Sequence, residues 1–244
     1  MQTEQYLVFD IETSPLPFDT FSESQQEYWL RGTSTDQEKE KKLNEMGLTP
    51  LTASVVCIGL QLMQGNFESG WEMINRAAFS SQINIGSETK CETLETGSHC
   101  YISDEQKLLN DFWKILIKYR DAELVSFNGR NFDAPFLMLR SALLGIKPSR
   151  NLMSGTKFNY SKHTDLLDEL TFYMPQQSGA TRRFNFDFYT RAFGIKSPKS
   201  EGVDGSHVSK LYNENRVIEI AEYCLRDVTA TWNLFLKWKE FLKF

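Results

Sequence analysis

This sequence lacks long apolar runs, abundant cysteine and an excess of basic residues. No stretch approaches the roughly 20 consecutive apolar residues that span a bilayer. The polar start, Met1 to Tyr6, lacks the basic-then-apolar pattern of a signal peptide. The four cysteines are too few and too scattered for a disulfide framework. Together these absences argue against a membrane-spanning or disulfide-stabilised protein and predict a cytoplasmic one.

The net charge of −5 argues against a protein that coats nucleic acid through bulk electrostatic attraction. The charge is uneven, because residues 140–199 hold ten Lys or Arg against four Asp or Glu. A basic segment on an acidic chain suits local contact with a nucleic-acid backbone. A solvated surface explains the same count equally well.

The length and the 41% hydrophobic content predict one domain over residues 1–244 with a substantial core. Strands are expected near 6–12, 53–62, 67–73 and 122–127, and helices near 103–119, 135–144, 184–193 and 213–241; residues 163–167 are expected to be a short strand that enters a helix. Two insertions are expected, a polar excursion at about 17–50 that is either helical or mobile and a segment without clear periodicity at about 75–101. This order of elements indicates an α/β fold, with a mixed central sheet and helices on its faces.

Two acidic residues, Asp10 and Glu12, lie at the end of the first apolar strand. Because side chains alternate along a strand, both carboxylates point to the same face. Two neighbouring carboxylates repel each other and resist burial, and a hard divalent cation removes both problems. A solvated strand end would also explain such a pair, so the pair alone does not identify a metal site.

Two further segments carry acidic residues in suggestive contexts. Residues 128–133 join an expected strand to an expected helix, where Asp133 is either a ligand or a helix cap. In the last helix, Tyr223 and Asp227 are four residues apart and share one face. Taken separately, each is also explained by an ordinary turn or by packing.

In order and context, the three segments resemble the motifs of the DEDD superfamily of 3′–5′ exonucleases in its tyrosine (DEDDy) variety. Phe9-Asp10-Ile11-Glu12-Thr13 is similar to the first motif, Asn128 to Asp133 to the second, and Tyr223-x-x-x-Asp227 to the third. Within the superfamily, the sequence is most similar to predicted 3′–5′ exonucleases related to the proofreading domain of family B DNA polymerases. The resemblance implies a ribonuclease-H-like fold.

The resemblance also implies a chemistry for these residues. Asp10, Glu12, Asp133 and Asp227 would hold two divalent cations, Mg²⁺ or Mn²⁺, for hydrolysis of phosphodiester bonds from the 3′ end. Tyr223 would orient the attacking water. The residues expected to contact the substrate are Thr13, Asn128 and Phe132. Phe132 would stack on a base or, as an equal alternative, anchor the turn as a core aromatic.

Other polar residues receive weaker assignments. Lys162, His163, Arg182 and Arg183 are candidates for backbone contacts, with a solvated surface as the alternative. Asp165 fits none of the three motifs and is expected to be structural or to face the substrate. A zinc site at Cys91, His99 and Cys100 is rejected, because it lacks paired short spacings and a fourth ligand.

The expected partner is the 3′ end of nucleic acid, with single-stranded DNA favoured over RNA. Two alternatives remain: an exoribonuclease on the same fold, distinguished only by contacts to the 2′-hydroxyl, and a non-catalytic nucleic-acid-binding module. The presence of all four acids and Tyr223 weighs against the second.

Overall fold

A seven-stranded sheet forms the centre of the computed structural model, which describes residues 3–85, 88–156, 158, 160, 162–197 and 205–243. Its strands are β1 (Glu4–Pro15), β2 (Ala53–Asn66), β3 (Gly70–Ser81), β4 (Lys90–Thr93), β5 (His99–Ser103), β6 (Glu123–Ser126) and β7 (His163–Asp165). They lie in the order β4-β5-β3-β2-β1-β6-β7. β1 is antiparallel to β2 and parallel to β6, which confirms the expected mixed α/β sheet.

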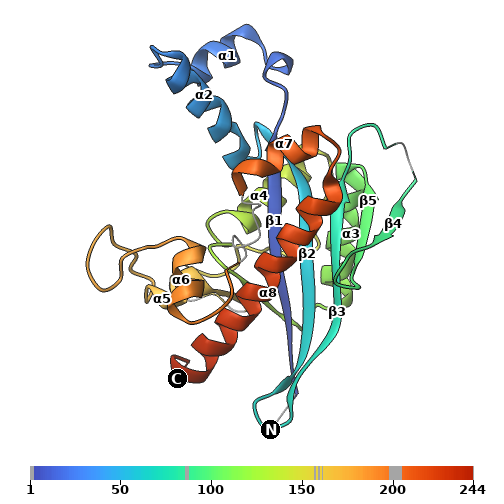
Figure 1. Ribbon diagram of the computed structural model, residues 1–244, viewed down its shortest axis with the longest axis vertical. Helices are drawn as coiled ribbons and strands as arrows, with labels where there is room; N and C mark the ends of the chain where they lie inside the picture. The colour runs from blue at the N-terminus through green and yellow to red at the C-terminus, as the bar shows by residue number, and fades with distance from the viewer. Residues whose placement is uncertain are drawn as a thin grey trace.

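The sheet is covered by helices on both faces (Figure 1). The helices are α1 (Glu23–Trp29), α2 (Asp36–Glu45), α3 (Glu105–Lys118), α4 (Asp133–Leu143), α5 (Leu166–Leu170), α6 (Phe186–Ala192), α7 (Val208–Asn213) and α8 (Val217–Phe241), with short 3-10 turns η1 (Phe18–Thr20), η2 (Met46–Leu48) and η4 (Gly205–His207). In the described part of the chain, no helix is long and apolar enough to cross a membrane.

β1 is buried on both faces because it lies between two helical layers. Leu7 and Phe9 pack into the core under α3 and α4. Tyr6 and Val8 point the other way into the core under α8, where the rings of Tyr6 and Phe235 are 4.7 Å apart. Burial of side chains of this size contributes roughly 1.5–3 kcal/mol each. β1 is therefore a rigid base for the acids near its end.

The hairpin between β2 and β3 turns later than the sequence suggested. The expected strands at 53–62 and 67–73 placed the turn between them, but β2 continues to Asn66 and the turn occupies residues 67–69. The side-chain oxygen of Asn66 accepts hydrogen bonds from the amides of Glu68 and Ser69, both at 2.9 Å. This side-chain turn sets where the chain reverses.

The expectation of an irregular insertion at 75–101 is wrong for its local structure. β3 runs on to Ser81, and β5 pairs with it in parallel from Ala77↔His99 to Ser81↔Ser103. β4 then pairs with β5 at the sheet edge. All of β4 is exposed, so it has no buried face and no apolar alternation that could reveal it.

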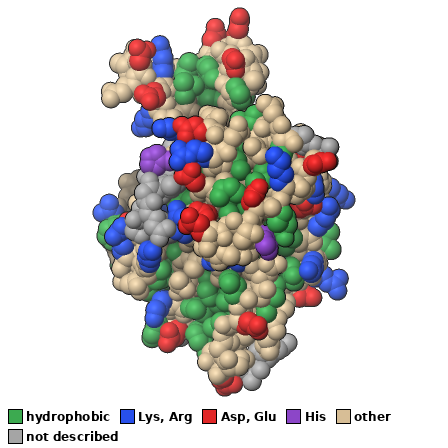
Figure 2. Space-filling view, turned by 45° about the vertical axis from the view of Figure 1, so that its right-hand side comes forward, with side chains coloured by type: hydrophobic (Ala, Val, Ile, Leu, Met, Phe, Trp, Pro, Cys, Tyr) green, Lys and Arg blue, Asp and Glu red, His purple; other side chains and the backbone are tan. Residues whose placement is uncertain are grey.

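Two further helical regions complete the fold. The excursion at 17–50 consists of η1, α1, α2 and η2, and it projects beyond the end of the sheet as a lobe (Figures 1 and 2). The last helix, expected over about 213–241, is α8, which begins only at Val217 because the separate short helix α7 ends at Asn213. Asn215 between α7 and α8 has a φ of 57°, a left-handed conformation that stops one helix before the next begins.

Candidate active site

Asp10 and Glu12 project from the same face of β1, as the alternation predicted. Glu12 is only 9% exposed, and the β1–β2 register shifts between Glu12 and Thr13. The hydroxyl of Thr13 donates a hydrogen bond of 2.7 Å to the carbonyl of Gly47. The side chain of Thr13 therefore ties β1 to the end of the 17–50 excursion.

Asp133 is attached directly to β1. It is the first residue of α4, is 4% exposed, and its Oδ1 accepts a hydrogen bond of 3.1 Å from the main-chain amide of Ile11. The helix N-cap is Phe132, which makes no side-chain capping bond. The structure thus favours the site interpretation of Asp133 over the helix-cap alternative, because its carboxylate reaches between Asp10 and Glu12.

The turn before α4 has little steric freedom. Asn128 has a φ of 63°, and a Cβ at Gly129 would overlap the side chain of Ser126. Asp165 holds this turn from β7, since its carboxylate accepts from the amides of Asn128 and Arg130, both at 2.8 Å. The structural interpretation of Asp165 is confirmed.

α8 supplies the third part of the site. Asp227 lies near enough to Asp10, Glu12 and Asp133 to act on the ionisation of each. Tyr223, one turn earlier and 5% exposed, is hydrogen-bonded to Asp227.

The side chain of Cys224 also faces Asp10, with Sγ 3.6 Å from Oδ2. α8 approaches β2 closely because Gly59 has no side chain; a Cβ there would lie 2.9 Å from Cys224 Sγ.

The site strongly disfavours uncompensated negative charge. Burial, followed by the neighbouring acids, raises the pKa of Asp10 and of Glu12 well above the usual carboxyl range. Burial also raises the pKa of Asp133 to about 7, although the hydrogen bond from Ile11 lowers it. All four acids offer oxygen atoms, which are the ligands that hard divalent cations prefer, and Asp10 and Glu12 bring theirs within 4.8 Å of each other.

A cleft of about 480 Å³ opens beside these acids and is lined by Asp10, Phe127, Asn128, Leu167, Arg183, Phe184, Asn185, Phe186, Asp227 and Thr231. Arg183 Nη2 donates a hydrogen bond of 2.8 Å to the side-chain oxygen of Asn128. Phe184 stacks on Phe188, with ring centroids 4.2 Å apart. Of these lining residues, Asp10, Asn128, Arg183 and Asp227 were singled out from the sequence. The aromatic and basic run at residues 182–186 could have indicated Phe184, Asn185 and Phe186 as further lining residues.

Several expected substrate contacts have other environments. His163 is 3% exposed, and its Nε2 lies 2.7 Å from Ser126 Oγ. Burial lowers the pKa of His163 to about 3, so this residue is neutral and lies in the core. The expectation that it contacts the nucleic-acid backbone is wrong. Phe132 is half-buried and packs on Phe136 at 5.5 Å, which favours its anchoring role. Lys162 pairs with Asp121 at 3.8 Å.

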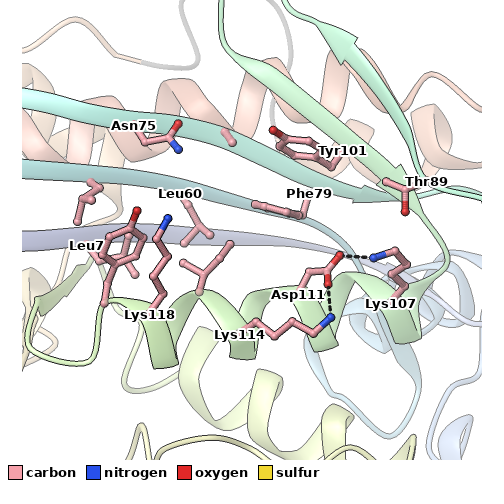
Figure 3. Close-up of a pocket in the computed structure, with 14 residues that line it drawn as sticks. Leu7, Leu60, Asn75, Phe79, Thr89, Tyr101, Lys107, Asp111, Lys114 and Lys118 are labelled. Atoms are coloured by element: carbon pink, nitrogen blue, oxygen red, sulfur yellow. Dashed lines mark hydrogen bonds and ion pairs between the residues drawn. The ribbon is translucent and has the colours of Figure 1, made fainter.

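A second cavity lies on the opposite face of the sheet. Figure 3 shows this space of about 450 Å³ between α3 and the strands, with Leu60 and Phe79 on one side. Asp111 bridges Lys107 and Lys114 on its α3 side, at 2.6 and 3.0 Å. None of the four clustered acids lines this cavity. On the side of the molecule drawn in Figure 2, basic and acidic side chains of the described residues are interspersed and form no continuous basic patch.

Comparisons with known proteins agree with this geometry. A solved family B DNA polymerase from the hyperthermophilic archaeon Pyrobaculum calidifontis matches with a TM-score of 0.57 and 19% identity, over 98% of this chain. The chain spans about a quarter of that polymerase, 25% of its length. At this identity the likeness shows the fold alone, which is the ribonuclease-H-like fold of such exonuclease domains. A search of curated proteins gave no match.

A family model described as a predicted 3′-5′ exonuclease related to the exonuclease domain of PolB matches residues 77–243. The match contains the Asn128–Asp133 turn and the Tyr223–Asp227 segment, as well as strands β4 and β5. Asp10 and Glu12 precede it, so their place in the site depends on the geometry of β1. The chain belongs to this family of predicted 3′–5′ exonucleases related to the exonuclease domain of PolB.

Proposed function

We propose that this protein is a metal-dependent 3′–5′ exonuclease that hydrolyses phosphodiester bonds at the 3′ end of single-stranded DNA. The observation that carries the proposal is the hydrogen bond from the Ile11 amide to Asp133. It joins an acid from a distant segment to the strand that bears Asp10 and Glu12. With Asp227 beside them, acids from three separated segments form one cluster.

The donor set supports a pair of hard cations. Asp10, Glu12, Asp133 and Asp227 are the proposed ligands, and the raised pKa values of three of them reflect negative charge that cations would neutralise. Mg²⁺ or Mn²⁺ is preferred because all these ligands are carboxylate oxygens. When bound, such a pair activates water and stabilises both the attacking and the leaving oxygen.

Tyr223 acts by position rather than as a base. Burial, followed by the negative charge of Asp227, raises the pKa of its phenol above the usual value. The hydroxyl therefore stays protonated at neutral pH. A protonated phenol held against Asp227 is a fixed hydrogen-bonding group, which suits orientation of the attacking water.

The cleft provides contacts to the terminal nucleotides. Arg183, held by Asn128, offers a cation to a phosphate next to Asp10 and Asp227. The stacked Phe184 and Phe188 give the wall an aromatic face on which a base can stack without sequence preference. Thr13 and Phe132 remain proposed contacts of the substrate end.

The test is incubation of the purified protein with 5′-labelled single-stranded DNA and RNA oligomers. Parallel reactions contain Mg²⁺, Mn²⁺ or a chelator. We expect a ladder of shortened 5′-labelled DNA with either ion and intact oligomer with chelator. Equal shortening of RNA would make the protein an exoribonuclease as well. No metal-dependent shortening of either oligomer would refute the proposed function.

A further inference from the structure

A thiol lies within the carboxylate cluster. Cys224 Sγ is 3.6 Å from Asp10 Oδ2 and 3.5 Å from the main-chain oxygen of Asp10. A carboxylate oxygen of Asp10, a carboxylate oxygen of Glu12 and the Cys224 sulfur all lie within 4.8 Å of one another. The exonuclease mechanism proposed above makes use of the carboxylates and leaves this sulfur without a role.

Glu12 supplies an independent indication of a ligand. Its side chain is 9% exposed, and within the described part of the chain no hydrogen bond reaches its carboxylate. It is within 4.8 Å of both the Asp10 oxygen and the Cys224 sulfur. A buried carboxylate without a partner is costly, and a cation at this point relieves the cost.

The spacing of sulfur and oxygen suits a tetrahedral ion. An ion that binds oxygen at about 2.1 Å and sulfur at about 2.3 Å in tetrahedral geometry holds the two atoms about 3.6 Å apart. This equals the 3.6 Å between Asp10 Oδ2 and Cys224 Sγ. Mg²⁺ prefers octahedral oxygen ligands, whereas Zn²⁺ and other thiophilic ions select sulfur.

We propose that Asp10, Glu12 and Cys224 form a binding site for a thiophilic divalent ion, Zn²⁺ or Cd²⁺, which competes with the hard cations of the exonuclease. Each acid gives one oxygen and Cys224 gives its thiolate sulfur, while the thiol proton passes to water. The competition rests on the proposed function, because both kinds of ion need Asp10 and Glu12. Such an ion inhibits cleavage by occupying these ligands.

The chain offers a matched control for Cys224. Cys57 is also fully buried, pairs with Glu12 across β1 and β2, and lies against Cys224. It is outside the three-ligand group. Cys91 is exposed and would take up ions nonspecifically, so the experiment starts from a Cys91→Ser parent.

The experiment is titration of this parent with Cd²⁺, followed by thiolate-to-cadmium charge-transfer absorption in the near ultraviolet. We expect a band that saturates at one thiolate per chain and that excess Mg²⁺ suppresses. Adding Cys224→Ser should abolish the band and weaken Cd²⁺ binding by about 100-fold or more. Loss of a residue that only hydrogen-bonds to a metal ligand already lowers metal affinity by about 10–100-fold. Adding Cys57→Ser should leave the band intact.

An undiminished band in a folded Cys224→Ser protein would overturn the inference, as would absence of a band in the parent. If Cys224→Ser does not fold, Asp10→Asn replaces it, and an unchanged Cd²⁺ affinity in that variant would be equally decisive. Oligomer cleavage is measured on the parent in parallel. Cleavage without a band removes only the thiophilic site, and a band without cleavage removes only the proposed exonuclease.

Discussion

The main-chain amide of Ile11 donates a 3.1 Å hydrogen bond to the carboxylate of Asp133, which lies 122 residues later in the chain. The donor lies between Asp10 and Glu12 on β1, so this contact fixes how far the second acidic segment stands from the first. A buried amide without an acceptor would cost about 1–3 kcal/mol, which couples folding to assembly of the site.

Two substitutions of Asp133 separate the effect of its negative charge from the effect of its hydrogen bond to Ile11. Asp133→Asn keeps an oxygen that can accept from Ile11 but removes the negative charge. We expect a folded protein with cleavage reduced at least about 100-fold. Asp133→Ala also loses the acceptor, so its free energy of unfolding should fall by about 1–3 kcal/mol relative to the Asn variant. Denaturant unfolding and oligomer cleavage measure the two effects. Equal stability of the two variants would show that the hydrogen bond contributes little.

Asp227→Asn tests the charge of the cluster from the α8 side. Asp10 and Glu12 both have pKa values raised in part by Asp227, so removal of that charge relieves repulsion in the metal-free protein. We expect a higher melting temperature in chelator, a smaller rise on addition of Mg²⁺, and loss of cleavage. Asp10→Ala should also abolish cleavage in a folded protein. Cleavage at the wild-type rate by either variant would remove the metal-ligand assignment.

The raised pKa values also predict how metal-free stability depends on pH. Asp133 titrates near pH 7 when folded and near its ordinary value of about 3.9 when unfolded, so the folded chain binds more protons between these values. Its contribution to the free energy of unfolding therefore falls as pH rises from about 4 to about 7. In chelator, wild type should melt at a lower temperature at pH 7.5 than at pH 5.5. Asp133→Asn should lose part of this difference, and an unchanged pH profile would show that Asp133 is not its source.

Local sequence patterns were enough to predict part of the site. Alternation along a strand was enough to place Asp10 and Glu12 on one face, and helical spacing was enough to pair Tyr223 with Asp227. The convergence of these segments depends on strand pairing and helix packing, which no local pattern encodes. It was anticipated only through the resemblance of the motifs. Only the folded chain shows the approach of Cys224 to Asp10.

Other errors have the same physical origin. His163 is polar, and its burial beside Ser126 follows from the position of β7 next to β6. β4 has no buried side, because it pairs at the sheet edge. Arg183 reaches Asn128 across 55 residues of sequence, and neither residue identifies the other locally. Local periodicity therefore located the helices and inner strands better than the cleft wall.

Arg183 provides a test of the cleft. Arg183→Ala should raise the KM for a single-stranded oligomer by about tenfold, equivalent to about 1.4 kcal/mol, with a smaller effect on kcat. The slope of log affinity against log salt should become shallower by about 0.7 if the residue contacts one phosphate. Arg191→Ala is the matched control, because Arg191 is exposed, pairs with Asp187 on α6 and does not line the cleft. Equal effects of the two variants would show only a general loss of positive charge.

Tyr223→Phe separates orientation of water from binding of metal. The variant keeps the buried ring and its packing on α8, so any loss belongs to the hydroxyl that is hydrogen-bonded to Asp227. Groups that position or transfer a proton typically contribute about 10²–10⁴-fold, and we expect a decrease of that size in the single-turnover cleavage rate. Because Tyr223 is not a proposed ligand, Mg²⁺ should still raise the melting temperature as much as in wild type, by binding the folded site and not the unfolded chain. Affinity for the oligomer end should also be retained.

Asp227→Asn, one turn away, should instead lose both the cleavage and much of the metal response. A Tyr223→Phe protein that cleaves as fast as wild type would make this tyrosine a packing residue, whereas one that loses the metal response would place the phenol among the groups that hold the metal.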